Sequence, residues 1–419
     1  MFNRRPASIQ RPGPWFVPGS LTRTFDDWPT LYYPRLTVPR ILCVNPYGGI
    51  IGPNLSLRDL VHGLRGSAYE VHLCRSETDA VFDDFDGPTL TLSGVERLNF
   101  SSPKRLLFQV PKLSLSFARL LQYIRTQQID LVLCNGEVNP IAAMAARAAG
   151  RPAFIQFRAL SFLSRGGLAR TYLKTLHRLG VRFIANSKAT AAAMVAAGLP
   201  KSAITTIYNP IRSVAFAEAC DPVPLRRELG ISATAPLIGF VGLLMREKGA
   251  STLFQIVKLL IARFPDLRCL YVGGENTMGH DAPQRQALLD EVKALGLSDH
   301  ILFTGYRTDL NRVYRSLDCF VHPSPSESFG RSLAEAMFCE RAAVCFHIGA
   351  LPELVVHGVT GYLIPPGNVE AFATCVAELL DNKALARQMG TAGRQRALEH
   401  FTQERHLTDM KHLFSEALQ

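Results

Sequence analysis

Residues 319–337 read CFVHPSPSESFGRSLAEAM, and this stretch decides the expected fold class. It begins with a short apolar run at Cys319–His322, passes through a loop of Pro and Ser residues, and continues after Gly330 into a helical pattern at 333–339. A short apolar strand followed by a loop and a helix is the repeating unit of a parallel sheet covered by helices. Because the first amides of a helix are unpaired and favour an anion, the sequence predicts a site near Gly330 that suits an anion such as a diphosphate.

Two carboxylates flank this expected helix start. Glu327 lies in the loop, and Glu335 lies just over one turn into the helix. Carboxylate oxygens accept hydrogen bonds from paired hydroxyl groups, so this spacing suits a sugar near the loop and a ribose further back. Taken alone, Glu335 fits a salt-bridged surface residue of a helix better than a ligand-binding one.

The same alternation of strands and helices extends over the chain in two blocks. Strand-like runs lie at 41–45, 69–74, 131–135, 152–157 and 182–186, and again at 237–241, 269–273, 301–304, 319–322 and 343–346. Helical patterns lie between them, and Asn209-Pro210 with the loosely patterned residues 211–234 predicts a linker. We therefore expect an α/β protein with two doubly wound, Rossmann-like parallel-sheet domains facing a central cleft, at 40–210 and 211–401. A helix at about 402–419 is expected to pack back on the first domain.

Composition narrows the class of protein. The chain has 419 residues, 47% of them hydrophobic, which excludes a disordered chain, and no uncharged apolar stretch of about 18 residues predicts a membrane-spanning helix. The formal net charge is +11, and residues 101–200 hold 14 Lys and Arg against two acidic residues. This asymmetry predicts an anionic partner for the first domain, with a merely solvated basic surface as the alternative.

Residues 1–39 and the spacing of the cysteines predict where in the cell the protein is located. Residues 1–39 carry seven prolines and both tryptophans, which favours an irregular arm over the protein's own surface rather than a membrane-binding helix. No secretory signal pattern precedes Arg40, and the nine cysteines are scattered without a Cys-x-x-Cys pair. We expect a cytoplasmic protein, peripheral at the inner face of the membrane if the basic domain contacts lipid.

Residues 40–419 resemble the retaining glycosyltransferases of family 4, the glycosyl transferases group 1, which have the two-domain GT-B fold. The resemblance rests first on the Glu-x7-Glu motif formed by Glu327 and Glu335, with Phe329-Gly330 between them. Further matching positions are Gly48-Gly49, Asn186-Ser187, Tyr208-Asn209, Gly242, Lys248-Gly249, Gly349, Pro352-Glu353-Leu354 and the segment 358–361.

The resemblance implies transfer of a sugar from a nucleotide-diphosphate sugar to an acceptor hydroxyl, with retention and with no metal or other cofactor. Glu327 and Lys248 are the implied catalytic residues, because Glu327 holds the donor sugar and Lys248 neutralises the departing diphosphate. The implied donor-binding residues are Gly48, Gly49, Gly242, Arg307, Phe329, Gly330, Arg331, Ser332 and Glu335, and Arg158 is implied on the acceptor side. The expected partners are a nucleotide sugar, a saccharide or lipid-linked acceptor and an anionic membrane, and no nucleic acid.

Three positions depart from the family pattern. Leu243 stands where the family usually has a second cation for the diphosphate, with Arg246 as a substitute, and Ala350 replaces the second glycine of a pair. Arg158 follows a strand that often ends in His. These departures leave open a sugar-binding or regulatory relative without turnover. A nucleotide-sugar epimerase of similar fold is a third hypothesis, against which Glu327 and Glu335 argue.

Two other signals are assigned structural roles. Asp84-Phe85-Asp86 resembles a metal-binding Asp-x-Asp motif but lies in an acidic loop without the expected strand, so we predict a solvated loop. His322 is expected to be a packed residue at a strand end rather than a general base.

Overall fold

The described part of the chain covers most of the sequence. The structure is a computed structural model, and it describes residues 38–49, 51–76, 79–92, 103–218, 221, 223–274 and 282–419, with only the backbone of 103–108 and 282. The predicted arm at 1–39 lies outside the described residues except for its last two positions. Residues 38–419 form one compact unit.

The first sheet has seven parallel strands in the order β3-β2-β1-β4-β5-β6-β7. Its strands are β1 (Arg40–Val44), β2 (Glu70–Arg75), β3 (Thr89–Thr91), β4 (Leu131–Asn135), β5 (Ala153–Phe157), β6 (Arg182–Ala185) and β7 (Ile204–Thr206). Its helices are α1 (Gly52–Leu64), η1 (Ala80–Phe82), α2 (Pro103–Thr126), α3 (Ile141–Ala148), α4 (Leu160–Leu163), α5 (Gly167–Arg178), α6 (Lys188–Ala196) and η2 (Lys201–Ala203).

The second sheet has six parallel strands in the order β10-β9-β8-β11-β12-β13. Its strands are β8 (Leu237–Val241), β9 (Arg268–Val272), β10 (Ile301–Gly305), β11 (Cys319–His322), β12 (Ala343–Phe346) and β13 (Gly361–Ile364). The helices that follow β7 are η3 (Ser213–Phe216), α7 (Val223–Glu228), η4 (Arg246–Lys248), α8 (Ala250–Leu260), α9 (Ala282–Ala294), α10 (Leu310–Ser316), α11 (Arg331–Phe338), α12 (Leu351–Leu354), α13 (Val369–Asp381), α14 (Lys383–His400) and α15 (Gln403–Leu418).

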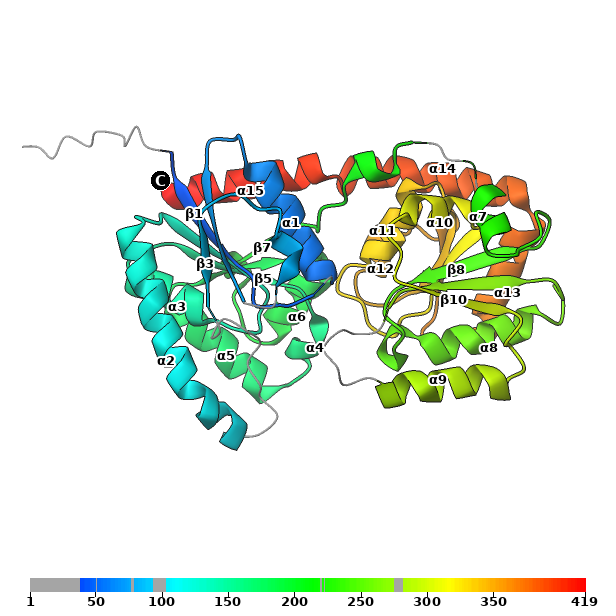
Figure 1. Cartoon of the computed structure of the whole chain (residues 1–419), viewed down its shortest axis with the longest axis horizontal. Helices are drawn as coiled ribbons and strands as arrows, with labels where there is room; N and C mark the ends of the chain where they lie inside the picture. Colours follow the sequence, from blue (N-terminus) through cyan, green and yellow to red (C-terminus); the bar gives the residue numbers. More distant parts are fainter. Residues whose placement is uncertain are drawn as a thin grey trace, which may run out of the picture. The chain divides into compact units, whose positions relative to one another are not determined.

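Both sheets are covered by apolar residues of helices on two faces. In the first sheet, one core joins β4 and β5 to α2, α3 and α5, and the other joins β1 and β4 to α1 and α15. In the second sheet, α8 and α13 cover one face and α10 and α11 cover the other. The prediction of two doubly wound parallel-sheet domains is therefore confirmed. Helix α15 lies beside α1, as Figure 1 shows, and Leu407 contacts Gly63 there.

The strand order indicates where each sheet would be expected to bind a ligand. The chain runs outward from β1 to β3 and then returns to β4 on the other side of β1, and β8 and β11 repeat this reversal. Crevices at such reversals, beyond the carboxyl ends of the strands, are where open parallel sheets bind ligands. The loops after β1, β4, β8 and β11 are therefore the positions at which binding residues are expected.

The expected linker at 211–234 is packed, because it contributes to the core of the second sheet. Ile211, Phe216 and Leu225 are all buried there, and Ile211 bridges to Thr402 at the start of α15. Helices η3 and α7 have only four and six residues, which is too few for a repeat of apolar residues to predict them from the sequence.

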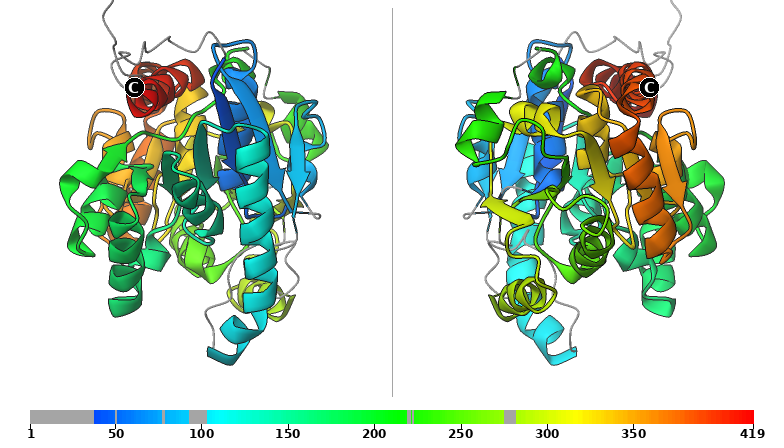
Figure 2. Two further views of the ribbon diagram at one scale, coloured as in Figure 1. Left: turned by 90° about the vertical axis from the view of Figure 1, so that its left-hand side faces the viewer. Right: turned by 90° about the vertical axis from the view of Figure 1, so that its right-hand side faces the viewer.

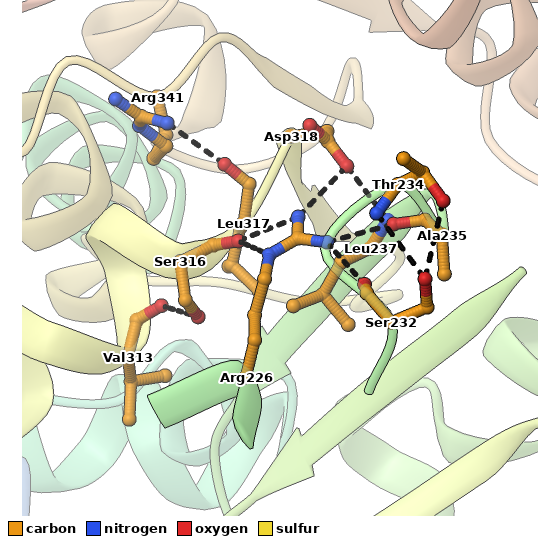
Figure 3. Close-up of polar contacts among 10 residues, drawn as sticks. All are labelled: Arg226, Ser232, Thr234, Ala235, Leu237, Val313, Ser316, Leu317, Asp318 and Arg341. Carbon is orange, nitrogen blue, oxygen red and sulfur yellow. Dashed lines mark hydrogen bonds and ion pairs between the residues drawn. The ribbon is translucent and has the colours of Figure 1, made fainter. Parts of the chain in front are cut away.

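A buried arginine of α7 ties these elements to the second sheet. The guanidinium of Arg226 donates to the carbonyl oxygens of Ser316, at 3.0 and 3.2 Å, and of Ala235, at 2.8 Å (Figure 3). It also lies 3.2 Å from the carboxylate of Asp318, which accepts the amide of Leu237 at 2.7 Å. These bonds hold α7 against the amino ends of β8 and β11.

No helix of the described residues is both long and apolar enough to cross a bilayer.

Candidate functional site

Lys248 and Glu327 form an ion pair at the carboxyl ends of β8 and β11. The Nζ atom of Lys248 donates to Oε2 of Glu327 at 2.9 Å, and the side chains are 37% and 11% exposed. Burial acts to raise the pKa of Glu327, but Lys248 and His322 outweigh it and hold this pKa well below its usual range. The two predicted catalytic residues are therefore in contact, with Glu327 ionised and Lys248 open to solvent.

Two glycines allow this contact because no other residue fits at their positions. Gly249 has φ +82°, and a Cβ there would lie 2.1 Å from the carbonyl oxygen of Pro323. Gly349 has φ +54°, and a Cβ there would lie 2.1 Å from the carbonyl oxygen of Glu327. The Lys248-Gly249 and Gly349-Ala350 turns thus both lie against the loop that carries Glu327.

His322 is packed, as expected, and it also contacts the predicted catalytic pair. Its ring stacks on Phe240 and Phe320, with centroids at 5.7 and 6.1 Å. Its Nε2 atom lies 3.4 Å from Oε2 of Glu327, although the angles do not qualify as a hydrogen bond. His322 therefore limits where the Glu327 carboxylate can lie.

The start of α11 has the features of an anion site. Gly330 is its N-cap residue with φ +94°, and no described side chain caps the helix. The amides of Arg331 and Ser332 follow in its first turn, where the helix dipole favours negative charge. The Phe329 side chain is buried against Tyr208 and Phe401, so its ring anchors the loop and only its backbone can contact a ligand.

Glu335 is buried and already hydrogen-bonded. Its Oε2 accepts from the hydroxyl of Tyr314 and its Oε1 accepts from Arg331, both at 2.9 Å. Burial raises the pKa of Glu335 although Arg331 and Tyr314 act to lower it. Each carboxylate oxygen can accept a second bond, so a role in ribose binding remains a prediction.

The Arg331 side chain connects α11 to the first domain. Its guanidinium lies 3.2 Å from the carboxylate of Asp59 in α1, and it also donates to the hydroxyl of Ser56 and the carbonyl oxygen of Pro210. The resemblance implies a role only for the Arg331 amide, and no local pattern predicts these side-chain contacts.

Two buried asparagine side chains bond to the Gly48-Gly49 loop after β1. Asn54 in α1 donates to the carbonyl oxygen of Gly49 at 2.7 Å, and Asn45 donates to that of Tyr47 at 2.9 Å. Gly49 has φ +74°. These bonds turn the carbonyl groups of Tyr47 and Gly49 toward the protein, an arrangement compatible with an anion-binding loop.

Arg158 follows β5 and is buried, its guanidinium bonded to side-chain amides and its backbone amide bonded to the carboxylate of Glu137 at 3.0 Å. It donates to the side-chain oxygens of Asn135 and Gln156, each at 2.8 Å, and to that of Asn209. Burial lowers the pKa of Arg158 to about 9. The guanidinium itself bonds to these amide oxygens, while the Glu137 carboxylate acts on it electrostatically and offsets part of its charge.

The remaining predicted residues lie at the carboxyl ends of β8 and β10. Gly242 follows β8 and donates its amide to Val272 at 2.9 Å. Arg307 follows β10 and is paired with Asp309 at 2.8 Å and with Glu228 at 3.0 Å. Arg246, the substitute for a cation at Leu243, pairs instead with Glu291 at 3.2 Å and is 54% exposed. The structure therefore places Lys248, and not Arg246 or Arg307, beside Glu327.

The Asp84-Phe85-Asp86 loop is ion-paired with α1. Asp84 contacts Arg58 and lies 3.5 Å from His62, while Asp86 contacts Arg65. No group of three or more metal-ligating side chains occurs among the described residues.

Sequence reasoning assigned no role to Asn45 and Asn135, at the ends of β1 and β4, and noted Asn186 after β6 only as a position that matches the family. Asn135 donates to Asn45 at 2.9 Å, and Asn186 donates to the hydroxyl of Ser328 at 3.2 Å. The signal was present, because a polar residue directly after a buried strand lies at the edge where ligands bind.

Family comparisons cover both domains. The model of glycosyltransferase family 4 matches residues 51–213, and that of glycosyl transferases group 1 matches residues 224–396. N-acetyl-alpha-D-glucosaminyl L-malate synthase of Bacillus anthracis is 28% identical over 219 residues, which are 52% of this chain and 55% of that protein. D-inositol 3-phosphate glycosyltransferase of Mycobacteroides abscessus is 32% identical over 221 residues, which are 52% of this chain and 47% of that protein. The chain thus spans about half the length of these curated relatives.

A solved structure shares the fold. The crystal structure of HepE from Anabaena in complex with UDP-glucose has a TM-score of 0.76 and 23% identity, and covers 90% of this chain and 99% of that one. With the Glu327 and Glu335 motif in place, the two family matches and this fold establish that the chain belongs to the family 4 glycosyltransferases, the glycosyl transferases group 1, with the GT-B fold.

Proposed function

We propose that this protein is a retaining glycosyltransferase that moves a sugar from a nucleotide-diphosphate sugar to an acceptor hydroxyl. The observation that carries the proposal is the ion pair of Lys248 and Glu327 beside the uncapped start of α11. A mobile cation, a fixed carboxylate and a row of unpaired amides suit the diphosphate and the sugar hydroxyls of one donor.

The residues have separate tasks in this reaction. The bond between the anomeric carbon and the diphosphate oxygen breaks, and the acceptor oxygen bonds to that carbon on the same face. The acceptor proton passes to the departing diphosphate. Lys248 and the amides of Gly330 and Arg331 stabilise the charge that grows on the diphosphate, and Glu327 accepts hydrogen bonds from the sugar. No metal is required for this scheme, because the protein itself supplies the positive charge.

The acceptor side points to a group with negative charge. Arg158 is a buried cation with amide partners at the carboxyl end of β5. Two relatives are named for L-malate and D-inositol 3-phosphate, both of which are anions, and a third is a lipopolysaccharide core mannosyltransferase of Rhizobium meliloti. We therefore propose an anionic acceptor, lipid-linked or part of a cell-envelope saccharide.

Of the departures from the family pattern, Ala350 is accommodated without strain. It has φ −85° and ψ −5°, which alanine adopts as readily as glycine, and its amide donates to the carbonyl oxygen of Glu327 at 3.0 Å. This supports turnover over a sugar-binding relative without activity.

A panel of UDP-, GDP- and ADP-sugars tests the proposal. Incubation with each donor should release the nucleoside diphosphate from one of them, slowly to water and faster when an acceptor is present. EDTA should leave this release unchanged, and NMR of the product should show the anomeric configuration of the donor. A sugar that changes configuration while still attached to its nucleotide would identify an epimerase, and binding without release would identify an inactive relative.

Exposed side chains of α2 support a membrane contact for the first domain. The end of α2 extends beyond the sheet in both views of Figure 2, and Val110 and Leu115 are 46% and 54% exposed. Lys112 and Arg119 are exposed on the same side of the helix as Leu115, and no acidic residue occurs between Glu96 and Asp130. Apolar and basic side chains on one projecting helix suit an anionic lipid surface.

Sedimentation with vesicles tests this contact. The protein should bind vesicles of phosphatidylglycerol and phosphatidylcholine but not of phosphatidylcholine alone, and raised salt should weaken binding. Replacing both Lys112 and Arg119 by Gln should lower the affinity, by about fivefold for each charge removed. Lys258→Gln, on α8 of the second domain, is the matched control. Equal binding to both kinds of vesicle would contradict the electrostatic contact.

A further inference from the structure

Glu353 of the second domain caps a helix of the first domain. Its side chain projects from α12, and its two carboxylate oxygens accept the backbone amides of Lys188 at 2.8 Å and Ala189 at 2.7 Å. The same carboxylate accepts the hydroxyl of Tyr208 at 2.9 Å. All three donors belong to the first domain or to the segment that leaves it, so this one side chain joins the two sheets.

The start of α6 needs this carboxylate. The N-cap residue Ser187 accepts the amide of Thr190 at 3.0 Å, which leaves the amides of Lys188 and Ala189 for another acceptor. The first turn of α6 has no acidic residue of its own. A carboxylate from outside the helix therefore satisfies two amides and also interacts favourably with the positive end of the helix dipole.

The helix that carries Glu353 also holds the loop that carries Glu327. Ala350, at the N-cap of α12, donates its amide to the carbonyl oxygen of Glu327 at 3.0 Å. The other end of α12 is fixed by Arg396, which donates to the carbonyl oxygens of Glu353 and Leu354 at 2.7 and 2.8 Å. Helix α12 is a single turn, so Glu353 lies three residues from Ala350. A shift of Glu353 therefore also shifts the Ala350 amide that bonds to the carbonyl oxygen of Glu327.

Ser328 makes a second contact next to Glu327. Its hydroxyl donates to the carbonyl oxygen of Arg158 at 2.6 Å and accepts from Asn186 at 3.2 Å. The loop of Glu327 is therefore fastened to the carboxyl edge of the first sheet by its own serine, and through α12 by Glu353.

We propose that Glu353 is a positioning residue that sets Glu327 against the acceptor side by capping α6 across the domains. The inference rests on the proposed function, because Glu327 acts there on the donor sugar. The bonds of Glu353 form only while the edges of the two sheets are in contact. Loss of Glu353 therefore lowers the fraction of molecules with a complete site, and the observed activity falls with that fraction. In the proposed function the nucleoside diphosphate is held mainly by Lys248 and the start of α11, both in the second domain, so its affinity should depend less on the contact than kcat does.

The test compares Glu353→Ala with Asn382→Ala. Asn382 caps α14 by accepting the amide of Leu385 at 3.0 Å, so its variant loses a helix cap that joins no domains. We expect Glu353→Ala to lower kcat for transfer at least about tenfold, while the affinity for the nucleoside diphosphate that most raises the wild-type Tm, among UDP, GDP and ADP, changes less than about threefold. Both variants should lower Tm by similar amounts, and only Glu353→Ala should lower kcat.

Two more variants separate positioning from folding. Glu353→Gln keeps one accepting oxygen and should give an intermediate kcat, and Tyr208→Phe removes only the hydroxyl. If the hydroxyl acts through Glu353, Tyr208→Phe should have little further effect in the Glu353→Ala background. These milder variants carry the test if Glu353→Ala does not fold.

Hydrogen exchange gives a readout that does not depend on activity. Glu353→Ala, or Glu353→Gln in its place, should speed exchange both at the start of α6 and in residues 326–330, whereas Asn382→Ala should change neither. Unchanged exchange in 326–330, or a kcat equal to that of Asn382→Ala, would overturn the positioning role. A wild type that releases no nucleoside diphosphate from any donor would instead contradict the proposed function, and exchange would still decide the role of Glu353.

Discussion

At the scale of single residues, the surroundings of Lys248 and Glu327 differ in a way that suits their separate proposed tasks. Glu327 is almost buried and meets both Lys248 and His322, so its carboxylate stays ionised and fixed. Lys248 is more exposed and lies at the end of a short η4 turn, so its ammonium group can reach a ligand. In the chain without donor they neutralise each other, which stabilises a carboxylate that burial alone would destabilise.

His406 makes stability depend on pH. Its ring is buried on α15, its Nδ1 lies 2.6 Å from the carbonyl oxygen of Tyr208, and burial lowers its pKa from 6.5 to about 3. Below pH 6.5 the unfolded chain binds a proton that the folded chain does not, so stability falls as pH decreases toward 3. The contribution of His406 to this slope is at most about 1.4 kcal/mol per pH unit.

His406→Asn checks this effect, because Asn keeps a donor for Tyr208 but does not titrate. Urea unfolding at pH 7 and pH 5 should show a smaller loss of stability for the variant than for the wild type. His412→Asn, at a side chain that is 72% exposed, serves as the control. An equal loss in wild type and His406→Asn would show that His406 takes up a proton in the folded state.

At the scale of elements, the stability of the second domain depends on polar bonds at the amino ends of β8 and β11. The candidate site lies at the opposite, carboxyl ends of these strands. Arg226 satisfies carbonyl oxygens of Ser316 and Ala235 and pairs with Asp318 (Figure 3). These groups lose their partner together if the guanidinium is removed, and unpaired buried polar groups cost free energy.

Arg226→Met should therefore lower the free energy of unfolding by about 3 kcal/mol. The matched control is Arg263→Met, whose ion pair with Asp381 is 66% and 43% exposed and should contribute less than about 1 kcal/mol. Urea unfolding measures both values. A change for Arg226→Met as small as the control would mean that water replaces the guanidinium at no cost.

Strand prediction from the sequence succeeded where strands are buried on both faces. All ten expected strands occur, and those that were missed are β3, β7 and β13. Each of these lies at the edge of its sheet and has only three or four residues, of which β3 and β7 bury none. Short, half-exposed strands have no continuous apolar run, so no local pattern separates them from loops.

At the scale of the whole molecule, the sequence pointed to candidate site residues but not to the contacts between the domains. The Glu-x7-Glu motif gave Glu327 and Glu335 as candidates and the Lys248-Gly249 match gave Lys248, and the structure brings Lys248 and Glu327 into contact. The contacts of Glu353 with Lys188 and of Arg331 with Asp59 join residues 165 and 272 positions apart. Such contacts depend on how two sheets meet, and no single segment of sequence contains that information.

The central claim is that Lys248 stabilises the departing diphosphate beside Glu327. The most direct measurement is the rate at which Lys248→Ala and Lys258→Ala release nucleoside diphosphate from the donor that the wild type uses. Lys258 lies on α8 of the same domain and donates to the carbonyl oxygen of Leu295, away from the site. We predict that Lys248→Ala lowers kcat by about 100- to 1000-fold and that Lys258→Ala retains the wild-type rate. Release by Lys248→Ala at the rate of Lys258→Ala would contradict the account.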